Sequence, residues 1–105
     1  MKLTKKIIAL IEQKTSCSVS EWKDKKGYNI YVDNACDEDY EIEVEKSDHA
    51  VEDIITACNC YDSDEHFRCW FGANNGEPTS ARDLLDNCEE IGEHLQELAD
   101  LLRGL

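Results

Sequence analysis

Positive charge is scarce in most of this sequence. From residue 29 to residue 105 the chain carries 21 acidic side chains and only four basic ones, Lys46, Arg68, Arg82 and Arg103. Seven lysines lie within the first 28 residues, and the whole chain has a net charge of -13. Such a surface cannot neutralise phosphates, which excludes ordinary nucleic-acid binding and favours a partner with a basic surface, or cations.

Long hydrophobic runs are also missing. The basic N-terminus is followed by five consecutive apolar residues, Ile7–Ile11, before Glu12 interrupts them. A secretory signal peptide needs about 7–15 apolar residues and a membrane span about 20, so neither is predicted. We therefore expect a cytoplasmic protein whose six cysteines stay reduced, which removes the premise of a disulfide framework.

Sequence motifs of common enzymes are absent as well. The chain contains no G-x-S-x-G, P-loop, G-x-G-x-x-G or H-E-x-x-H pattern,. Its three histidines, His49, His66 and His94, lie in no recognisable catalytic arrangement. The sequence predicts a protein without enzymatic activity and without a cofactor, folded as one domain over residues 1–105, because this length supports one modest core.

Hydrophobic periodicity predicts one helix, three strands and then further helices. Apolar residues recur at helical spacing over about 3–14 and alternate with polar residues in the segments that follow,. The predicted strands cover 17–23, 28–32 and 40–45, with turns at 24–27 and 34–39. This order predicts a two-layer α+β fold: an N-terminal helix, a three-stranded antiparallel meander, and two or three helices packed on one face of the sheet.

The starts of the later helices are marked by capping residues. Ser47 or Asp48 is predicted to cap the first, Asp62 or Ser63 a short second one, and Thr79 or Ser80 the last, over about 80–103, after a loop at 72–78,. The last helix carries an apolar seam with alternating steps of four and three residues: Leu84, Cys88, Ile91, Leu95, Leu98, Leu102 and Leu105. Such a seam buries against the sheet or forms a helix–helix contact. An accessory subunit that docks or dimerises through this helix is therefore one alternative, and the protein is expected to be a monomer or a homodimer.

Acidic residues line the opposite face of the same helix. They are Asp83, Asp86, Glu90, Glu93, Glu97 and Asp100, and no lysine or arginine occurs within 83–102. Like charges at i,i+4 destabilise a helix, so an unrelieved run indicates either a solvated face or a negative field that is itself used. A second acidic block comprises Asp37, Glu38, Asp39, Glu41, Glu43, Glu45, Asp48, Glu52 and Asp53.

A cluster of thiols supports a different hypothesis. Cys58, Cys60, His66 and Cys69 supply four ligands that zinc accepts, although C-x-C is not the usual spacing of a structural zinc site,. Cys58 also continues a helical apolar stripe, which favours a small core residue, as does the place of Cys88 in the seam. A small zinc- or redox-responsive protein that uses these four residues is the second alternative.

Residues 61–102 resemble a loose set of small acidic proteins encoded on mobile elements and in genomes of gut Firmicutes. The shared features are Asp64-Glu65-His66, Trp70, Pro78-x-Ser80-x-Arg82 and the Asp/Glu/Leu-rich helix that follows. The order of elements and the acidity are similar to small anti-CRISPR proteins that occupy the site on Cas9 that reads target DNA. The first resemblance implies a context, the mobile element or phage, more than an activity, and the second, which is one of topology and charge alone, transfers no residue roles.

These observations together predict an acidic binding protein. Its partner would be a protein with a basic surface, one that handles nucleic acid, and the protein itself would not touch nucleic acid or membrane. Mimicry of DNA by an inhibitor of host defence, of the anti-CRISPR or anti-restriction type, is the sharpest form of the prediction. The residues predicted to bind the partner are Glu41, Glu43, Glu45, Asp83, Asp86, Glu90, Glu93, Glu97 and Asp100.

Overall fold

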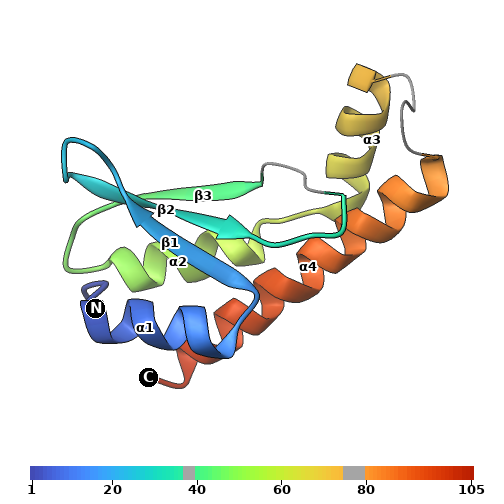
Figure 1. Ribbon diagram of the computed structural model, residues 1–105. Helices are drawn as coiled ribbons and strands as arrows, with labels where there is room; N and C mark the ends of the chain where they lie inside the picture. The colour runs from blue at the N-terminus through green and yellow to red at the C-terminus, as the bar shows by residue number, and fades with distance from the viewer. Residues whose placement is uncertain (37–39, 75–79) are drawn as a thin grey trace.

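The computed structural model describes residues 1–36, 40–74 and 80–105 (Figure 1). The elements follow in the order α1 (Lys5–Lys14), β1 (Cys17–Glu21), β2 (Gly27–Val32), β3 (Glu41–Glu45), α2 (Ala50–Asn59), α3 (Ser63–Asn74) and α4 (Ala81–Arg103). This confirms the predicted α+β class and its order of elements. No helix within the described ranges has the length and apolar character needed to cross a membrane.

Some of the sequence predictions fall outside the described residues. They are the end of the turn predicted at 34–39, with Asp37, Glu38 and Asp39 of the acidic block, and most of the loop predicted at 72–78, with Pro78. Thr79, the alternative cap of the last helix, also lies outside them.

The three strands form one antiparallel sheet in the order β1-β2-β3. Strand periodicity puts alternate side chains on opposite faces, and Ile30, Val32, Ile42 and Val44 are buried on one of them,. On that side α1 packs against β1, α2 against β3 and α4 against β2 (Figure 1). We call the opposite side the open face; by the same alternation it carries Asn29, Tyr31 and the odd-numbered glutamates of β3.

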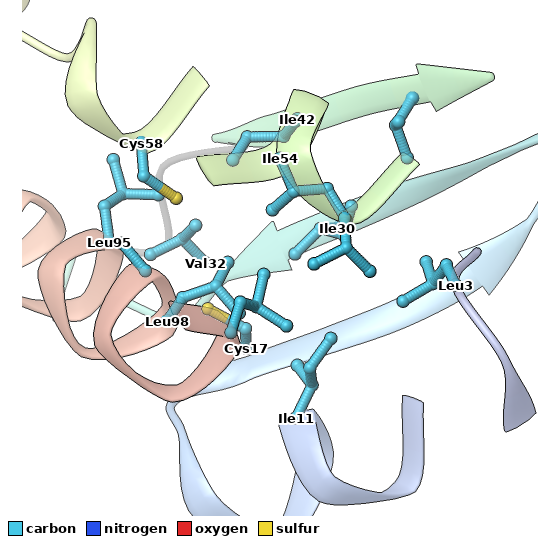
Figure 2. Packing of buried hydrophobic residues seen from close by; sticks show 14 of the residues in the cluster. Leu3, Ile11, Cys17, Ile30, Val32, Ile42, Ile54, Cys58, Leu95 and Leu98 are labelled. Atoms are coloured by element: carbon cyan, nitrogen blue, oxygen red, sulfur yellow. The ribbon is translucent and has the colours of Figure 1, made fainter. Parts of the chain in front are cut away.

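The hydrophobic core lies between the sheet and the helices (Figure 2). Ile54 of α2 and Leu98 of α4 are completely buried, and burial of one such side chain contributes about 1.5–3 kcal/mol to stability. The predicted seam of α4 is confirmed from Leu84 to Leu102, all of whose members are buried. The prediction is wrong for Leu105, which is 45% exposed because it lies beyond the helix C-cap, Gly104.

Side-chain caps fix the starts of the last two helices. Ser80 Oγ accepts a hydrogen bond from the backbone N–H of Asp83 at 3.2 Å, as predicted. Asp62 Oδ1 accepts from the N–H groups of Asp64, at 2.9 Å, and Glu65, at 3.2 Å, which satisfies donors that the first turn of α3 leaves free,.

The cap predicted for α2 is wrong. The N-cap residue is His49, and its side chain makes no capping hydrogen bond. Ser47 Oγ instead accepts from the N–H of His49 at 3.2 Å. Ser47 therefore forms a turn just before the helix, and the helix begins two residues later than a Ser47 cap would place it and one later than an Asp48 cap would,.

The helix α3 projects past the sheet and packs against α4 (Figure 1). Its base is held by Tyr61, whose hydroxyl donates to the carbonyl of Cys88 at 3.0 Å and lies 2.7 Å from His66 Nδ1. The Tyr40 ring meets the Tyr61 ring edge-on at 5.3 Å between centroids. Residues from the β2–β3 connection, α3 and α4 thus meet at one joint.

Candidate functional site

The acidic residues of α4 divide into two groups with different surroundings. The buried seam sets the rotation of the helix, so polar residues beside the seam reach the loops at one end of the sheet, while those opposite the seam face solvent,. We call Asn87, Glu90, His94 and Glu97 the clamp row. We call Asp86, Glu89, Glu93 and Asp100 the outer acidic face. The sequence pattern placed Glu90 and Glu97 in the same group as Glu93.

The clamp row binds the backbone of two loops. Glu90 Oε2 accepts from the N–H of Ala35 at 3.3 Å, and Asn87 Oδ1 accepts from the N–H of Cys36 at 3.1 Å. One turn further along the helix, His94 Nδ1 donates to the carbonyl of Asp33 at 2.6 Å. These bonds fix the segment that follows β2.

Glu97 extends the clamp row to the start of the sheet. Its Oε1 accepts from the backbone N–H of Ser16 at 3.1 Å, just before β1. Within the row, His94 Nε2 lies 3.8 Å from Glu90 Oε1. Glu90 and Glu97 therefore have structural partners inside the molecule, and the binding role predicted for them competes with these bonds.

The outer acidic face is largely free of positive charge. Arg82 Nε lies 3.3 Å from Asp86, and Arg103 lies 3.5 Å from Asp100, so both arginines sit near the ends of the face. Glu89 and Glu93 are exposed in the middle, and neither forms an ion pair with another described residue. Asp83 is also exposed, in the first turn of the helix.

The strand glutamates form a second negative surface, on the open face. Glu43 and Glu45 are exposed and lie opposite Asn29 and Gly27 of β2. Glu41 is half-buried, and its Oε2 atom is shielded from solvent without a hydrogen-bond donor in the described part of the chain. Every other described side-chain polar atom that is comparably buried has a hydrogen-bond partner.

Beside these glutamates, Trp22 packs on the open face. Trp22 Nε1 donates to Asn29 Oδ1 at 2.7 Å, and its ring covers Gly27, where an added Cβ would lie 2.7 Å from a ring carbon. At the same end of the sheet Lys46 binds Glu21, and this hydrogen bond lowers the pKa of the Glu21 carboxyl and raises the pKa of the lysine.

The structure does not bring the predicted zinc ligands together. Cys58 is buried and its side chain points into the core (Figure 2), whereas Cys60 and Cys69 are exposed. His66 Nδ1 is engaged by the Tyr61 hydroxyl at 2.7 Å. Among the residues that the structure describes, no group of three or more His, Cys, Asp or Glu side chains is placed to hold a metal ion.

Burial explains the state of the inner thiols. Loss of hydration raises the pKa of Cys58 to about 12 and that of Cys17 to about 11, because the thiolate is disfavoured away from water,. Cys88 is completely buried in the seam of α4. These three cysteines act as small core residues, as the sequence pattern indicated for Cys58 and Cys88.

Sequence reasoning missed the role of Asn87 and His94 in the clamp row. Asn87 is a polar residue that lies next to the seam and is only 2% exposed, and His94, which belongs to no recognisable motif, bonds to the carbonyl of Asp33. The available signal was the spacing of Asn87, Glu90, His94 and Glu97, which step by three, four and three residues beside the apolar seam.

Comparison with known proteins gives no relative. No protein-family model matches the chain. No curated protein matches it either, and neither does any solved structure. The two resemblances described above therefore remain predictions.

Proposed function

We propose that the protein is a non-enzymatic binding protein whose exposed carboxylates engage a basic surface of a protein that handles nucleic acid. The observation that carries this proposal is the outer acidic face of α4, where Glu89 and Glu93 are exposed and unpaired within the described chain. Acidic surfaces raise the rate of encounter with basic partners and discriminate against acidic ones. An inhibitor of host defence that mimics DNA, of the anti-CRISPR or anti-restriction type, is the most specific form of this function.

The spacing of the carboxylates supports the mimicry. Asp86 and Asp100 lie 14 residues apart on one helix, about 21 Å at 1.5 Å per residue,. Four carboxylates over that length average one per about 7 Å, and one DNA strand presents a phosphate every ~3.4 Å of helix axis, so the carboxylates match every second phosphate in axial spacing. The face is therefore suited to a basic groove that tracks one strand.

The clamp row supports the same mechanism by keeping α4 fixed. Hydrogen bonds made by Glu90, His94 and Glu97 tie the helix to the segments that precede β1 and follow β2, at one end of the sheet. A fixed row of charges loses little conformational entropy when it meets its partner, which favours affinity. The exposed carboxylates of the outer acidic face can then act without reorganisation of the fold.

Charge reversal of the outer acidic face tests the proposal. Glu89→Lys/Glu93→Lys is expected to abolish capture of the partner from a bacterial lysate, because it places two positive charges in the centre of the face. The partner captured by the natural chain should be released as salt rises from about 50 mM to about 200 mM, and by added duplex DNA. Reversal of Glu90 or Glu97 is avoided, since it would also break bonds to Ala35 or Ser16.

A matched variant controls for net charge. Asp53→Lys/Glu65→Lys changes the chain by the same four units of charge, on α2 and α3, and both residues are exposed. Capture should persist in this variant, and both variants should keep the thermal unfolding midpoint of the natural chain within a few degrees. If reversal of Glu89 and Glu93 leaves capture intact, or if the captured protein is indifferent to duplex DNA, the proposal fails.

A further inference from the structure

The two edges of the sheet differ in how their backbone groups are satisfied. On β1, the N–H of Cys17 donates to Thr15 Oγ1 at 3.2 Å, and the N–H of Val19 donates to Glu12 Oε2 at 3.2 Å. The helix α1 packs against this strand. Side chains at the end of α1 therefore occupy the outer edge of β1, where another strand would otherwise pair.

Among the residues that the structure describes, none covers the edge at β3 in this way. The bonds from Val32 N–H to the Tyr40 carbonyl, 3.1 Å, and from Lys46 N–H to the Lys26 carbonyl, 2.9 Å, fix the phase of the β2–β3 ladder. Because antiparallel pairs alternate, Ile42 and Val44 bond to β2, while the N–H and C=O groups of the three glutamates of β3 point away from the sheet,. Within the described residues these outward N–H groups have no hydrogen-bond partner.

The side chains on this edge define what can bind there. Glu43 and Glu45 are exposed on the open face, and the shielded Oε2 of Glu41 has no donor among the described residues. A second copy of the chain is a poor occupant, because pairing β3 with β3 would set glutamates beside glutamates, and like charges across a strand pair repel. A strand with basic side chains at alternate positions satisfies both the backbone and the carboxylates.

We propose that the free edge of β3 accepts an extended segment of a partner protein as a fourth, antiparallel strand with lysine or arginine at every second position. The proposal rests on the proposed function only for the sign of the partner's charge. Backbone hydrogen bonds supply affinity in this mode and the alternate side chains supply specificity. The basic residues lie directly opposite Glu41, Glu43 and Glu45, on the same face and in hydrogen-bonded pairs.

This register gives a sharp test with synthetic peptides. The probe is an alternating lysine–threonine peptide of about eight residues, long enough to span the strand, with binding followed by titration calorimetry. In the proposed geometry the lysine N–H groups face β3, and the threonine N–H groups face outward. N-methylation at the lysines should therefore weaken binding at least about tenfold, whereas N-methylation at the threonines should leave it within about twofold.

A pair of variants tests the same edge from the side of the protein. Glu43→Pro removes a carboxylate and the outward N–H but leaves the bonds of Ile42 and Val44 to β2, since proline is accepted on edge strands. Glu43→Ala removes only the carboxylate. We expect the peptide not to bind the proline variant, and to bind the alanine variant only a few-fold more weakly than the natural chain. Both variants should have the same strand content by circular dichroism.

The outcomes separate this inference from the proposed function. Equal binding by the two methylated peptides, or loss confined to methylation at threonine, overturns the antiparallel fourth strand, and so does equal binding by the two Glu43 variants. If in that case binding still weakens with salt, recognition of basic partners stands without strand addition. No binding by the unmodified peptide also overturns the inference, while the charge-reversal experiment on α4 decides the proposed function separately. If Glu43→Pro does not fold, the methylated peptides decide the question on the natural chain.

Discussion

Asn87 of α4 donates a hydrogen bond from Nδ2 to Oδ1 of Asn34, 53 residues earlier, at 3.2 Å. Both side chains are buried, at 2% and 8% exposure, although both are polar. Asn34 Nδ2 donates in turn to the carbonyl of Val32 at 3.1 Å, and Asn87 Oδ1 accepts from the N–H of Cys36. The two asparagines therefore supply hydrogen-bond partners to backbone groups at the end of β2 that would otherwise have to bond to water.

Replacing Asn87 should be costly for stability. In Asn87→Leu the N–H of Cys36 loses its acceptor and Asn34 loses a donor in a buried place, which is expected to lower the free energy of unfolding by about 1–3 kcal/mol. Urea denaturation measures this loss. Gln96→Leu is the control, because Gln96 is exposed on the same helix and its side chain bonds to the exposed Asp100. An equal loss in the two variants would contradict a structural role for Asn87.

Glu97 and Glu93 lie one turn apart on α4 and should respond differently to the same change. Glu97→Ala removes the acceptor of the Ser16 N–H, so we expect a loss of about 0.5–1 kcal/mol in unfolding free energy,. Glu93→Ala removes only an unpaired charge and should be neutral or slightly stabilising. Thermal or urea unfolding of both variants checks this. A larger loss of unfolding free energy for Glu93→Ala than for Glu97→Ala would contradict the division of the polar residues of α4 into the clamp row and the outer acidic face.

Gly27 has no room for a side chain. A Cβ there would lie 2.5 Å from the carbonyl oxygen of Val44 and 2.7 Å from a ring carbon of Trp22. Gly27→Ala must therefore shift β3 or Trp22, and we expect a loss of about 1–3 kcal/mol together with a change in tryptophan fluorescence. Ser20→Ala, an exposed change on β1, serves as the control. An unchanged stability and spectrum for Gly27→Ala would contradict the packing of Trp22 on this strand.

Stability should fall at alkaline pH because of the buried thiols. The pKa of Cys17 is raised to about 11 and that of Cys58 to about 12, against 9.0 for an ordinary thiol, mainly because burial disfavours the thiolate. Above pH 9 the unfolded chain releases protons that the folded chain retains, so the free energy of unfolding falls as pH rises towards the folded values. Between about pH 8 and pH 10.5 the expected loss is on the order of 2 kcal/mol per thiol.

Urea titrations at the two pH values measure this loss. The variant Cys17→Ala/Cys58→Ala is the reference, since other groups also titrate in this range. It should show a clearly shallower decline between the two pH values, whatever its stability at neutral pH. The same decline in both proteins would show that the buried thiols do not titrate as proposed.

Thiol labelling should distinguish the exposed cysteines from the buried ones. Cys60 and Cys69 are exposed and should react with a maleimide within minutes in the folded protein, whereas Cys17, Cys58 and Cys88 are buried and should react only after unfolding,. Peptide mapping by mass spectrometry identifies the labelled positions. Rapid labelling of Cys58 in the native protein would contradict its place in the core. One equivalent of zinc in protein purified without chelator would contradict the separation of Cys58 from Cys60 and Cys69.

Much of the fold follows from the sequence because burial repeats along it. The alternation of Ile42 and Val44 with glutamates predicts β3 and its buried face, and the steps of four and three residues predict the seam of α4. The start of α2 could not be predicted as easily, because a serine hydroxyl such as that of Ser47 can accept a backbone N–H either in a turn or as a helix cap,.

The candidate surfaces were only partly predictable. The charge pattern groups Glu90 and Glu97 with Glu93, since all three lie on the polar side of one helix. Which of them reaches a backbone amide depends on the approach of loops that lie 55 and 81 residues away in sequence, and nothing local records that approach. The difference between the two sheet edges has the same origin, because it depends on how α1 packs.

The clamp row has a consequence for the order in which the chain matures. Residues 16, 33, 35 and 36 can acquire these partners only after α4 has been synthesised, because all four partners lie within residues 87–97. A growing chain that ends before α4 also leaves Val32 and Ile54 without the leucines that complete their core. Such long-range closure slows folding and prolongs the exposure of unpaired strand edges. The glutamates of β3, unhelpful to pairing with a neighbouring copy, would guard the nascent sheet against association on the ribosome during that interval.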